Sequence, residues 1–314
     1  MARRLIVGCG YLGMRVAMGW LKQGDSVYAT TRTLTRAAEL RAIGIEPIVW
    51  DWLVGGLPNA MVPSQIMIET ESKFDTILVA VTHSILANLP AIETHTRGLN
   101  HLSNFLKAFG WWDVGGTKTQ WIYISTTGVF SPSSSHEWLD EESPVCPERP
   151  SSIAALAAEQ WLASNVSSDW RVVLRPVGIY GPGRVPRWQS IRDKTPLHVD
   201  PESYLNLIHV DDLTAIILAV SLSKMRSSLY CISDGEPVRR RDYYGYISKI
   251  GSWPPPVFES LQSSGIEPVN LRREGNKRIR NNRIQSELGV RLLYPSYREG
   301  LTAILGELRN LPTI

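Results

Sequence analysis

Short runs of apolar residues recur along the first half of the chain, and the segments between them carry apolar residues at every third or fourth position. Uniformly apolar runs of this length predict strands that are buried on both faces. We expect such strands at residues 4–8, 26–31, 46–51, 74–81, 120–125 and 170–176. The intervening periodicity predicts helices at residues 11–23, 35–43, 93–109 and 151–165.

This alternation of strands and helices indicates the fold class. Buried strands that are joined by helices must be parallel and covered on both faces. The sequence therefore predicts an α/β fold with a doubly wound parallel sheet and a smaller C-terminal domain.

The regular alternation ends after residue 176. Segments rich in proline and glycine follow at 179–184 and 253–256, and one strand-helix unit lies between them at 206–223, with Asp211 or Asp212 as its helix N-cap. We expect two interlocked domains. The larger would comprise residues 1–178 with 207–234, and the smaller residues 179–206 with 235–314.

A glycine-rich turn follows the first predicted strand and opens the first predicted helix. Residues 8–13 read GCGYLG, the spacing of a dinucleotide-binding Rossmann domain in the strand-to-helix setting that the motif requires. Gly8 would make the tight turn, Gly10 would admit the pyrophosphate, and Gly13 would let the helix pack on the strand. Tyr11 and Leu12 would complete the cofactor-binding loop. The alternative is a strand-helix turn without a ligand.

The end of the second predicted strand indicates which dinucleotide binds. NAD-binding domains usually carry an acidic residue there, which holds the ribose 2′-hydroxyl. Here no Asp or Glu lies between Asp25 and Glu39. Arg32 would pair with a 2′-phosphate and Thr31 would donate from its hydroxyl, so NADP(H) is favoured over NAD(H). The alternative for Arg32 is a solvated loop charge.

Nearly the whole chain resembles an extended short-chain dehydrogenase/reductase of the NAD-dependent epimerase/dehydratase type, in an atypical branch. Six blocks in the family's order carry this resemblance: GCGYLG at 8–13, ISTTGVF at 124–130, WLDE at 138–141, LRPVGIYGPG at 174–183, IHVDD at 208–212 and YPSYREG at 294–300.

The resemblance implies further cofactor contacts at three places along the chain. They would border the adenine, flank the cofactor and pass near the nicotinamide. The residues are, in that order, Asp51 with Trp52, Ala80 with Val81, and the group Pro176, Val177 and Ile179.

In this family a Tyr-x-x-x-Lys pair at the start of one helix carries the chemistry, because the lysine lowers the pKa of the tyrosine that moves the proton. In this chain the tyrosine position falls on Ser151 and the lysine position on Ala155. A serine does not titrate near neutral pH, and an alanine has neither charge nor donor. The usual proton relay is therefore predicted to be absent.

Three other residues are candidates for catalysis. Thr126 stands where the family's Ser or Thr polarises a substrate carbonyl. His95 lies close to the position of the family's Asn, and Tyr180 lies in the loop expected beside the nicotinamide. The alternatives are that His95 is a surface helix residue and that Tyr180 is an aromatic packing its loop.

Positive charge concentrates at the C-terminal end of the chain. Residues 235–314 contain 13 Lys or Arg and 8 Asp or Glu, an excess of five in a chain of net charge +3. The clusters at 239–241, 272–273 and 277–280 would bind a small anionic substrate, such as a nucleotide-sugar or a phosphorylated metabolite, or they form a solvated face. Nucleic acid is disfavoured as a partner, because aromatic residues do not interleave with the basic ones along this segment.

Composition excludes several classes. With 43% hydrophobic and 20% charged residues, the chain is neither disordered nor a coiled coil, and it has no apolar stretch long enough to span a membrane. A strand begins almost at the first Met, and the three cysteines match no disulfide or metal pattern. We therefore expect a cytoplasmic monomer or homodimer with reduced thiols and no metal.

Two functions follow from these features. The first is an NADP(H)-dependent epimerase/dehydratase or oxidoreductase that uses non-standard proton-transfer groups. The second is a catalytically degenerate protein that binds NADP(H) and has a redox-sensing or regulatory role.

Overall fold

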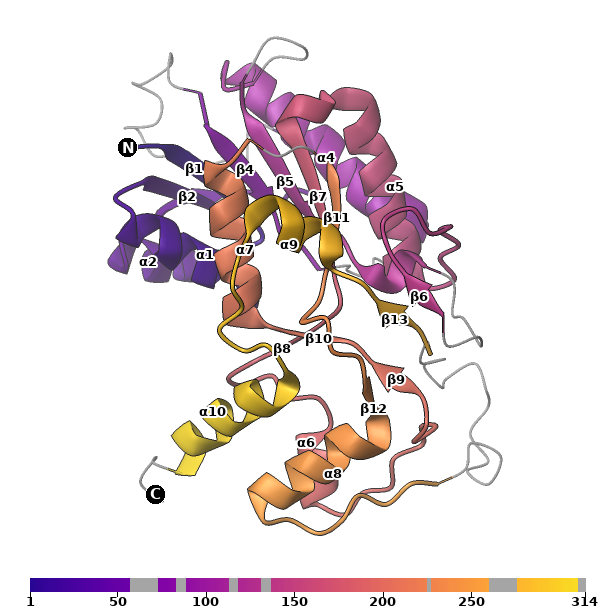
Figure 1. Cartoon of the computed structure of the whole chain (residues 1–314). Coiled ribbons are helices and arrows are strands. Elements are labelled where there is room, and N and C mark those ends of the chain that lie inside the picture. Colours follow the sequence, from indigo (N-terminus) through magenta and orange to yellow (C-terminus); the bar gives the residue numbers. More distant parts are fainter. Residues whose placement is uncertain are drawn as a thin grey trace. The chain divides into compact units, whose positions relative to one another are not determined.

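The computed structural model describes residues 1–56, 73–82, 89–112, 118–130, 137–224, 227–259 and 276–309 (Figure 1). Its centre is a seven-stranded sheet in the order β11-β7-β5-β4-β1-β2-β3. The five pairings from β3 to β7 are all parallel. Because the chain reverses its direction of travel across the sheet between β1 and β4, the sheet is doubly wound. The predicted Rossmann-like α/β fold class is therefore confirmed.

The strands of this sheet are β1 (Arg3–Val7), β2 (Ser26–Thr31), β3 (Glu46–Val49), β4 (Thr76–Val79), β5 (Gln120–Ile124), β7 (Arg171–Pro176) and β11 (Leu229–Ile232). Short strands lie outside it: β6 (Trp138–Leu139), β8 (Gly178–Tyr180), β9 (Tyr204–Leu205), β10 (Leu207–His209), β12 (Val238–Arg239) and β13 (Arg278–Ile279). The helices are α1 (Tyr11–Lys22), α2 (Leu34–Ala42), α4 (Ala91–Ala108), α5 (Pro150–Asn165), α6 (Trp188–Arg192), α7 (Val210–Leu222), α8 (Arg240–Gly251), α9 (Asn282–Leu288) and α10 (Tyr297–Arg309), with 3₁₀ turns η1 (Thr127–Val129) and η2 (Ser168–Trp170).

The predicted strands and helices of the first half are all present, with ends displaced by a few residues. The strand β11 was not predicted. The predicted N-cap of α7 was wrong, because the helix begins at Val210 and both Asp211 and Asp212 lie within its first turn. The carboxylate of Asp212 instead accepts hydrogen bonds from the backbone N–H groups of Leu293 and Tyr294, at 2.6 and 3.0 Å.

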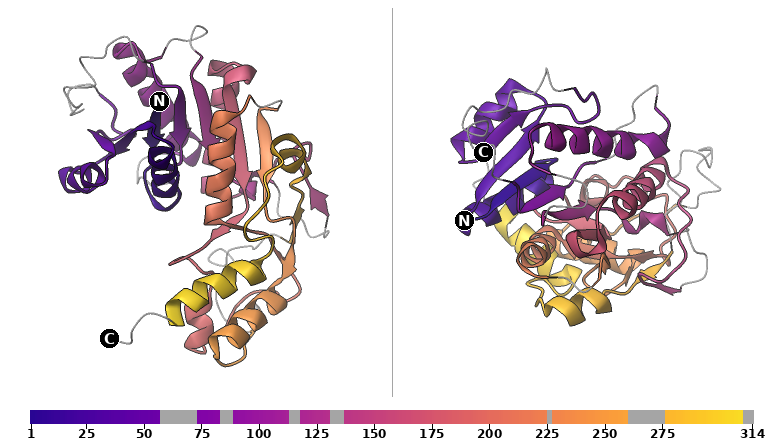
Figure 2. Two further views of the ribbon diagram at one scale, coloured as in Figure 1. Left: turned by 60° about the vertical axis from the view of Figure 1, so that its left-hand side comes forward. Right: turned by 90° about the horizontal axis from the view of Figure 1, so that it is seen from above.

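Helices cover both faces of the sheet. On one face α1 packs against α7, since a Cβ on Gly19 would lie 2.6 Å from the side chain of Leu218. The indole of Trp20 also donates to the Ser221 hydroxyl at 3.0 Å. On the other face α4 and α5 run side by side (Figure 2). This two-sided cover explains why the strands between them read as uniformly apolar runs.

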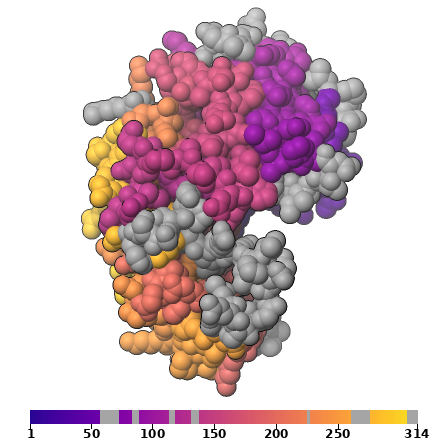
Figure 3. Space-filling model, turned by 90° about the vertical axis from the view of Figure 1, so that its right-hand side faces the viewer, coloured from indigo at the N-terminus to yellow at the C-terminus, as the bar shows by residue number. Residues whose placement is uncertain are grey.

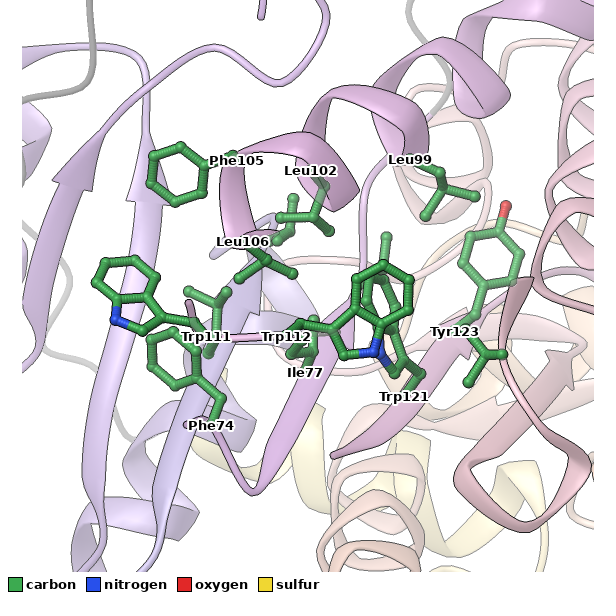
Figure 4. Packing of buried hydrophobic residues seen from close by; sticks show 14 of the residues in the cluster. Phe74, Ile77, Leu99, Leu102, Phe105, Leu106, Trp111, Trp112, Trp121 and Tyr123 are labelled. Carbon is green, nitrogen blue, oxygen red and sulfur yellow. The ribbon is translucent and has the colours of Figure 1, made fainter. Parts of the chain in front are cut away.

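Aromatic residues fill the core between the sheet and α4. Trp111, Trp112 and Trp121 are almost fully buried, and they pack with Phe74 and Phe105 (Figure 4). Their rings meet at centroid distances of 5 to 6 Å, many of them edge to face. Trp111 and Trp112 are therefore core aromatics of the first unit.

The chain divides into two compact units. The first comprises Met1–Val129, Cys146–Arg175 and Thr214–Tyr230, and the second Phe130–Val145, Pro176–Leu213 and Cys231–Ile314. These units are defined by packing alone. The expected division into a cofactor-binding domain and a substrate-binding domain stays a prediction.

Three further features bear on function. Cys9, Cys146 and Cys231 form no disulfide with one another. Across the part of the chain that the structure describes, no group of three or more His, Cys, Asp or Glu side chains could hold a metal ion. In the same residues, none of the helices has the length and apolar character needed to span a bilayer.

Candidate cofactor site

The glycine loop lies where the carboxyl ends of β1 and β4 are neighbours. Gly8 has a φ of +98°, a conformation that L side chains rarely adopt, and a Cβ there would lie 2.5 Å from the backbone oxygen of Ala80. The backbone of the loop therefore packs directly on Ala80 and Val81, which follow β4. In doubly wound sheets the crevice at this reversal of strand order is where ligands bind.

The other two glycines of the motif differ in their surroundings. A Cβ on Gly13 would collide with the backbone oxygen of Gly8, so only glycine allows α1 to pack this closely. At Gly10, a Cβ would meet no described atom within 4 Å. Gly10 is the N-cap of α1, and no side chain caps that helix. The helix N-terminus is therefore open on the side that a pyrophosphate would occupy.

The two residues between these glycines behave differently. Leu12 is buried with 8% of its surface exposed, so its side chain packs in the core. Tyr11 is half-buried, and its ring forms a cation–π contact with the Arg15 guanidinium, which lies 4.2 Å from the ring centroid. Arg15 also donates to the Tyr11 carbonyl at 2.9 Å.

Two arginines follow β2, at the same edge of the sheet as the glycine loop, because β1 and β2 are parallel. Arg32 is exposed, and its guanidinium forms no ion pair with a described residue. Arg36 lies in the first turn of α2 and pairs with Glu39 at 2.6 Å. Burial raises the pKa of the Cys9 thiol to about 11, and the positive charge of Arg36 opposes this rise. Arg36, which sequence reasoning missed, is therefore close enough to the glycine loop to act on it electrostatically.

The turn after β3 is held by local contacts. The carboxylate of Asp51 accepts a hydrogen bond from the Leu53 N–H at 2.9 Å. The ring of Trp52 packs on α4, where a Cβ on Gly98 would collide with it, and its centroid lies 5.7 Å from that of His95. Asp51 and Trp52 are both half-buried. Their contact with an adenine stays a prediction.

A pair of hydroxyls flanks the turn after β5. The Gly128 N–H donates to the Thr126 Oγ1 at 2.9 Å. The Ser152 hydroxyl of α5 lies on the same glycine, because a Cβ on Gly128 would collide with it. Since the Thr126 oxygen already accepts a bond, its own hydrogen is available to donate elsewhere. Ser152 was not among the predicted site residues.

The start of α5 carries the two positions assigned to the family's Tyr and Lys. Ser151 is exposed, whereas Ala155 is buried with 3% of its surface accessible. Neither side chain supplies an ionisable group. The remaining hydroxyl of this turn, on Ser152, is buried.

His95 is buried inside the first unit, with 4% of its surface exposed. The alternative that it is a surface helix residue is therefore wrong. Its Nδ1 forms a hydrogen bond of 2.8 Å with the Tyr123 hydroxyl of β5. Burial raises the pKa of Tyr123 well above its usual value, and the charge of Glu159 adds to this rise. A role for His95 in catalysis stays a prediction.

A buried ion pair lies beneath these groups. The Glu159 carboxylate of α5 accepts two hydrogen bonds from the Arg175 guanidinium of β7, at 2.6 and 3.0 Å. The side chains are only 5% and 9% exposed. Glu159 also accepts a hydrogen bond from the Ser125 hydroxyl, which directly precedes Thr126. This bidentate pair thus ties α5 to the ends of β5 and β7.

Tyr180 lies in the core of the second unit and is fully buried. Its hydroxyl lies 3.4 Å from the Ser296 carbonyl, and a Cβ on Gly300 would collide with it. Burial raises the pKa of this phenol far above its usual range, with Asp234 and Asp212 adding to the effect. A phenol that holds its proton this firmly is poorly suited to acid-base work. The contacts support the alternative that Tyr180 packs its loop.

The segment expected beside the nicotinamide begins at the carboxyl end of β7. Pro176 and Val177 are buried, and the Val177 N–H donates to the Ile232 carbonyl at 3.0 Å. Ile179 is half-buried in β8, opposite Ile208 of β10. A contact of these residues with a nicotinamide stays a prediction.

Solved structures of other proteins share this architecture. A functionally unknown conserved protein from Silicibacter pomeroyi DSS is 25% identical, with a TM-score of 0.75 over 99% of this chain and 100% of its own. A putative NAD-dependent epimerase/dehydratase from Methylobacillus flagellatus is 23% identical, with a TM-score of 0.71 over 98% and 99%. A dTDP-glucose 4,6-dehydratase from Bacillus anthracis, solved with NAD, is 15% identical, with a TM-score of 0.75 over 99% and 98%. The fold is thus that of NAD-dependent epimerase/dehydratase proteins.

Sequence comparison gives the same group of proteins. No protein-family model matches the chain. Protein YeeZ of Escherichia coli K12 is 24% identical over 295 residues, which is 94% of this chain and 97% of YeeZ. A short-chain dehydrogenase/reductase family 42E member 1 from Danio rerio is 31% identical over 148 residues, covering 39% of this chain and 38% of the fish protein. The neighbours of this chain are therefore epimerase/dehydratase and short-chain dehydrogenase/reductase proteins, as the sequence blocks predicted.

Proposed function

We propose that this chain binds NADP(H) at the glycine loop and belongs functionally with the NADP(H)-dependent epimerase/dehydratases and oxidoreductases. The observation that carries the proposal is the open backbone at Gly10. Of the three motif glycines it alone faces free space among the described atoms, and it caps α1 at the reversal of strand order. A pyrophosphate there would accept hydrogen bonds from the backbone N–H groups at the N-terminus of α1.

The preference for NADP(H) rests on Arg32 and Arg36 in the absence of an acidic residue at the end of β2. We expect Arg32→Asp to weaken NADPH binding at least tenfold, because a charge-assisted pair is worth roughly 1.5 to 3 kcal/mol. The same variant should bind NADH more tightly than NADPH. Fluorescence titration with both cofactors measures this. Arg41→Asp, at an exposed position at the other end of α2, is the matched control.

An unchanged preference in Arg32→Asp together with a lost preference in Arg36→Asp would assign the 2′-phosphate to Arg36 instead. Equal affinity of the wild type for both cofactors would remove both arginines from this role.

Thr126 is the group that we assign to the substrate. Its oxygen accepts the Gly128 N–H, so its hydrogen can be donated to a substrate carbonyl. NADP(H), when bound, would supply or accept a hydride. The ion pair of Glu159 and Arg175 holds Ser125, the residue before Thr126, and thereby positions this hydroxyl.

A specific observation favours the second candidate function, a degenerate NADP(H)-binding protein that senses redox state or regulates a partner. The assigned tyrosine and lysine positions hold an exposed Ser151 and a buried Ala155. The replacement phenol considered from sequence, Tyr180, is packed in the core of the second unit. None of these supplies a proton-transfer group near neutral pH.

We expect very low turnover of nucleotide-sugars and small carbonyls. Loss or gain of NADPH fluorescence measures this turnover. A general acid-base group contributes typically 10² to 10⁴-fold, so its absence should leave little activity. Ser151→Tyr combined with Ala155→Lys should gain activity that neither single variant shows, because the two groups act as a unit. Wild-type turnover of about 1 to 10³ per second would contradict a degenerate site.

We further propose that the second unit binds a small anionic substrate, such as a nucleotide-sugar. The basic excess of residues 235–314 and the dTDP-glucose dehydratase among the structural neighbours support this. The Arg272–Arg273 cluster lies outside the described residues. We also propose that the protein is a cytoplasmic monomer or homodimer, in keeping with its free cysteines.

A further inference from the structure

A carboxyl group is buried in the turn that follows β11. Only 6% of the surface of Asp234 is exposed. Its Oδ1 accepts a hydrogen bond from the Glu236 N–H at 3.0 Å. Its Oδ2 has no hydrogen-bond partner among the residues that the structure describes. Because an ionised oxygen that is buried without a donor is costly, a neutral, protonated carboxyl fits this place better.

Other acidic groups lie near Asp234. Its backbone N–H donates to the Leu207 carbonyl of β10 at 2.9 Å, which fixes the turn against that strand. The negative charges of Glu236 in the same turn and of Asp212 in α7 raise the pKa of Asp234. The charge of Asp234 in turn raises the pKa of Tyr180 in β8. An ionised Asp234 would therefore be repelled by two other carboxylates.

Further titratable groups border this cluster from β10, α7 and α10. Asp211 adds negative charge at the start of α7, and Glu299 and Tyr294 raise the pKa of Tyr180. The ring centroid of His209 lies 4.0 Å from that of Tyr294 and 5.1 Å from that of Tyr180. Its Nδ1 accepts a hydrogen bond from the Asp211 N–H at 3.2 Å, so this nitrogen carries no proton and the imidazole is neutral. His209 therefore does not offset the carboxylates.

Residues 293–300, which we call the entry segment of α10, are held by the same cluster. The Asp212 carboxylate accepts hydrogen bonds from the first two backbone N–H groups of this segment, at 2.6 and 3.0 Å. The Tyr180 hydroxyl lies 3.4 Å from the Ser296 carbonyl, and a Cβ on Gly300 would collide with that hydroxyl. The two side chains whose charge or pKa is coupled to Asp234 thus contact the entry segment directly.

We propose that Asp234 is a proton-dependent latch for the entry segment of α10. While the carboxyl keeps its proton, it is neutral and the segment stays docked on Asp212 and Tyr180. When the proton leaves, a second buried negative charge acts on Asp212, and the packing of the entry segment weakens. All of these residues belong to the second unit, and the latch does not depend on the proposed cofactor function.

The pH window of the latch follows from the ionisation of Asp234. Burial is the largest cause that raises the pKa of this carboxyl, from 3.8 to about 8. The folded chain therefore holds a proton that the unfolded chain releases within this window. The stability that this proton contributes is complete below pH 3.8 and is lost as the pH rises to about 8. Alkaline pH is thus expected to loosen the entry segment.

Urea denaturation of the full chain at about pH 5.5 and about pH 9, followed by circular dichroism, tests the proposal. Asp234→Asn has the shape of the protonated carboxyl and keeps the acceptor for the Glu236 N–H, but it carries no charge at either pH. The unfolding constant of the wild type, divided by that of Asp234→Asn, should rise at least about thirtyfold between the two pH values. A ratio that stays constant or falls would overturn the proposal.

Asp200→Asn is the matched control. The Asp200 Oδ1 accepts a hydrogen bond from the Glu202 N–H at 2.9 Å, in the same kind of turn and in the same unit, but Asp200 is exposed. The unfolding constant of this variant should change with pH as that of the wild type does. In the wild type itself, one aspartate carboxyl carbon should titrate near pH 8 in ¹³C NMR. Lack of such a titration would overturn the proposal without any variant.

Limited trypsin digestion at about pH 7 and about pH 9 tests whether the latch acts on the entry segment. Arg298 and Leu293 of this segment are exposed, and yellow side chains from this end of the sequence reach the surface in Figure 3. Cleavage after Arg298 requires local opening of the start of α10. Its rate in the wild type, relative to Asp234→Asn at the same pH, should rise about tenfold between the two pH values. Equal relative rates at both pH values would overturn the assignment of the latch to this segment.

Discussion

Gly10→Val is expected to abolish NADP(H) binding, weakening it at least about 100-fold, while the protein stays folded. A Cβ at this position meets no described atom within 4 Å, so the valine has room in the unliganded protein. The φ of Gly10 is −96°, outside the left-handed region that favours glycine. The added side chain would stand where the pyrophosphate approaches the α1 terminus.

Binding is measured by NADPH fluorescence, and folding by circular dichroism. Gly245→Val is the matched control, because Gly245 also faces free space among the described atoms but lies in α8, away from the motif. It should bind NADPH as the wild type does. Retained binding in Gly10→Val would remove the pyrophosphate from this loop.

The largest expected effect on stability is that of Arg175→Met. This change leaves the Glu159 carboxylate buried without its bidentate partner, and breaking a buried pair costs about 3 to 5 kcal/mol in the free energy of unfolding. The double variant Arg175→Met with Glu159→Leu should recover part of the loss, since no unpaired charge remains buried. Denaturation in urea, followed by circular dichroism, measures these differences.

Arg192→Met is the corresponding surface control. Arg192 pairs with Asp193 at 2.8 Å, but both side chains are about half exposed, so its loss should leave the midpoint unchanged. A midpoint for Arg175→Met equal to that of this control would contradict the structural weight given to the buried pair.

The sheet could be predicted from sequence because its strands are covered on both faces. Residues 4–8 and 120–125 read as apolar runs for that reason. The strand β11 was missed, although it has four residues like β3 and β4, which were predicted. The strands β6, β9, β12 and β13 have two residues each, too few for any periodicity.

Some residues of the candidate site could be predicted from consecutive positions in the sequence, whereas others are brought together only by tertiary packing. The glycine loop could be found because its turn, N-cap and helix are consecutive in sequence. The contact of Ser152 with Gly128 and the pair of Glu159 with Arg175 depend on how α5 packs against β5 and β7. Arg36 had a readable signal, since it follows Arg32 by one helical turn at the start of α2.

Isothermal titration calorimetry of the wild-type chain with NADPH and with NADH tests the central claim most directly. The account predicts one NADPH bound per chain, with an affinity at least about tenfold higher than that for NADH, because Arg32 would pair with the 2′-phosphate. No binding of either dinucleotide, or a preference for NADH, would contradict it.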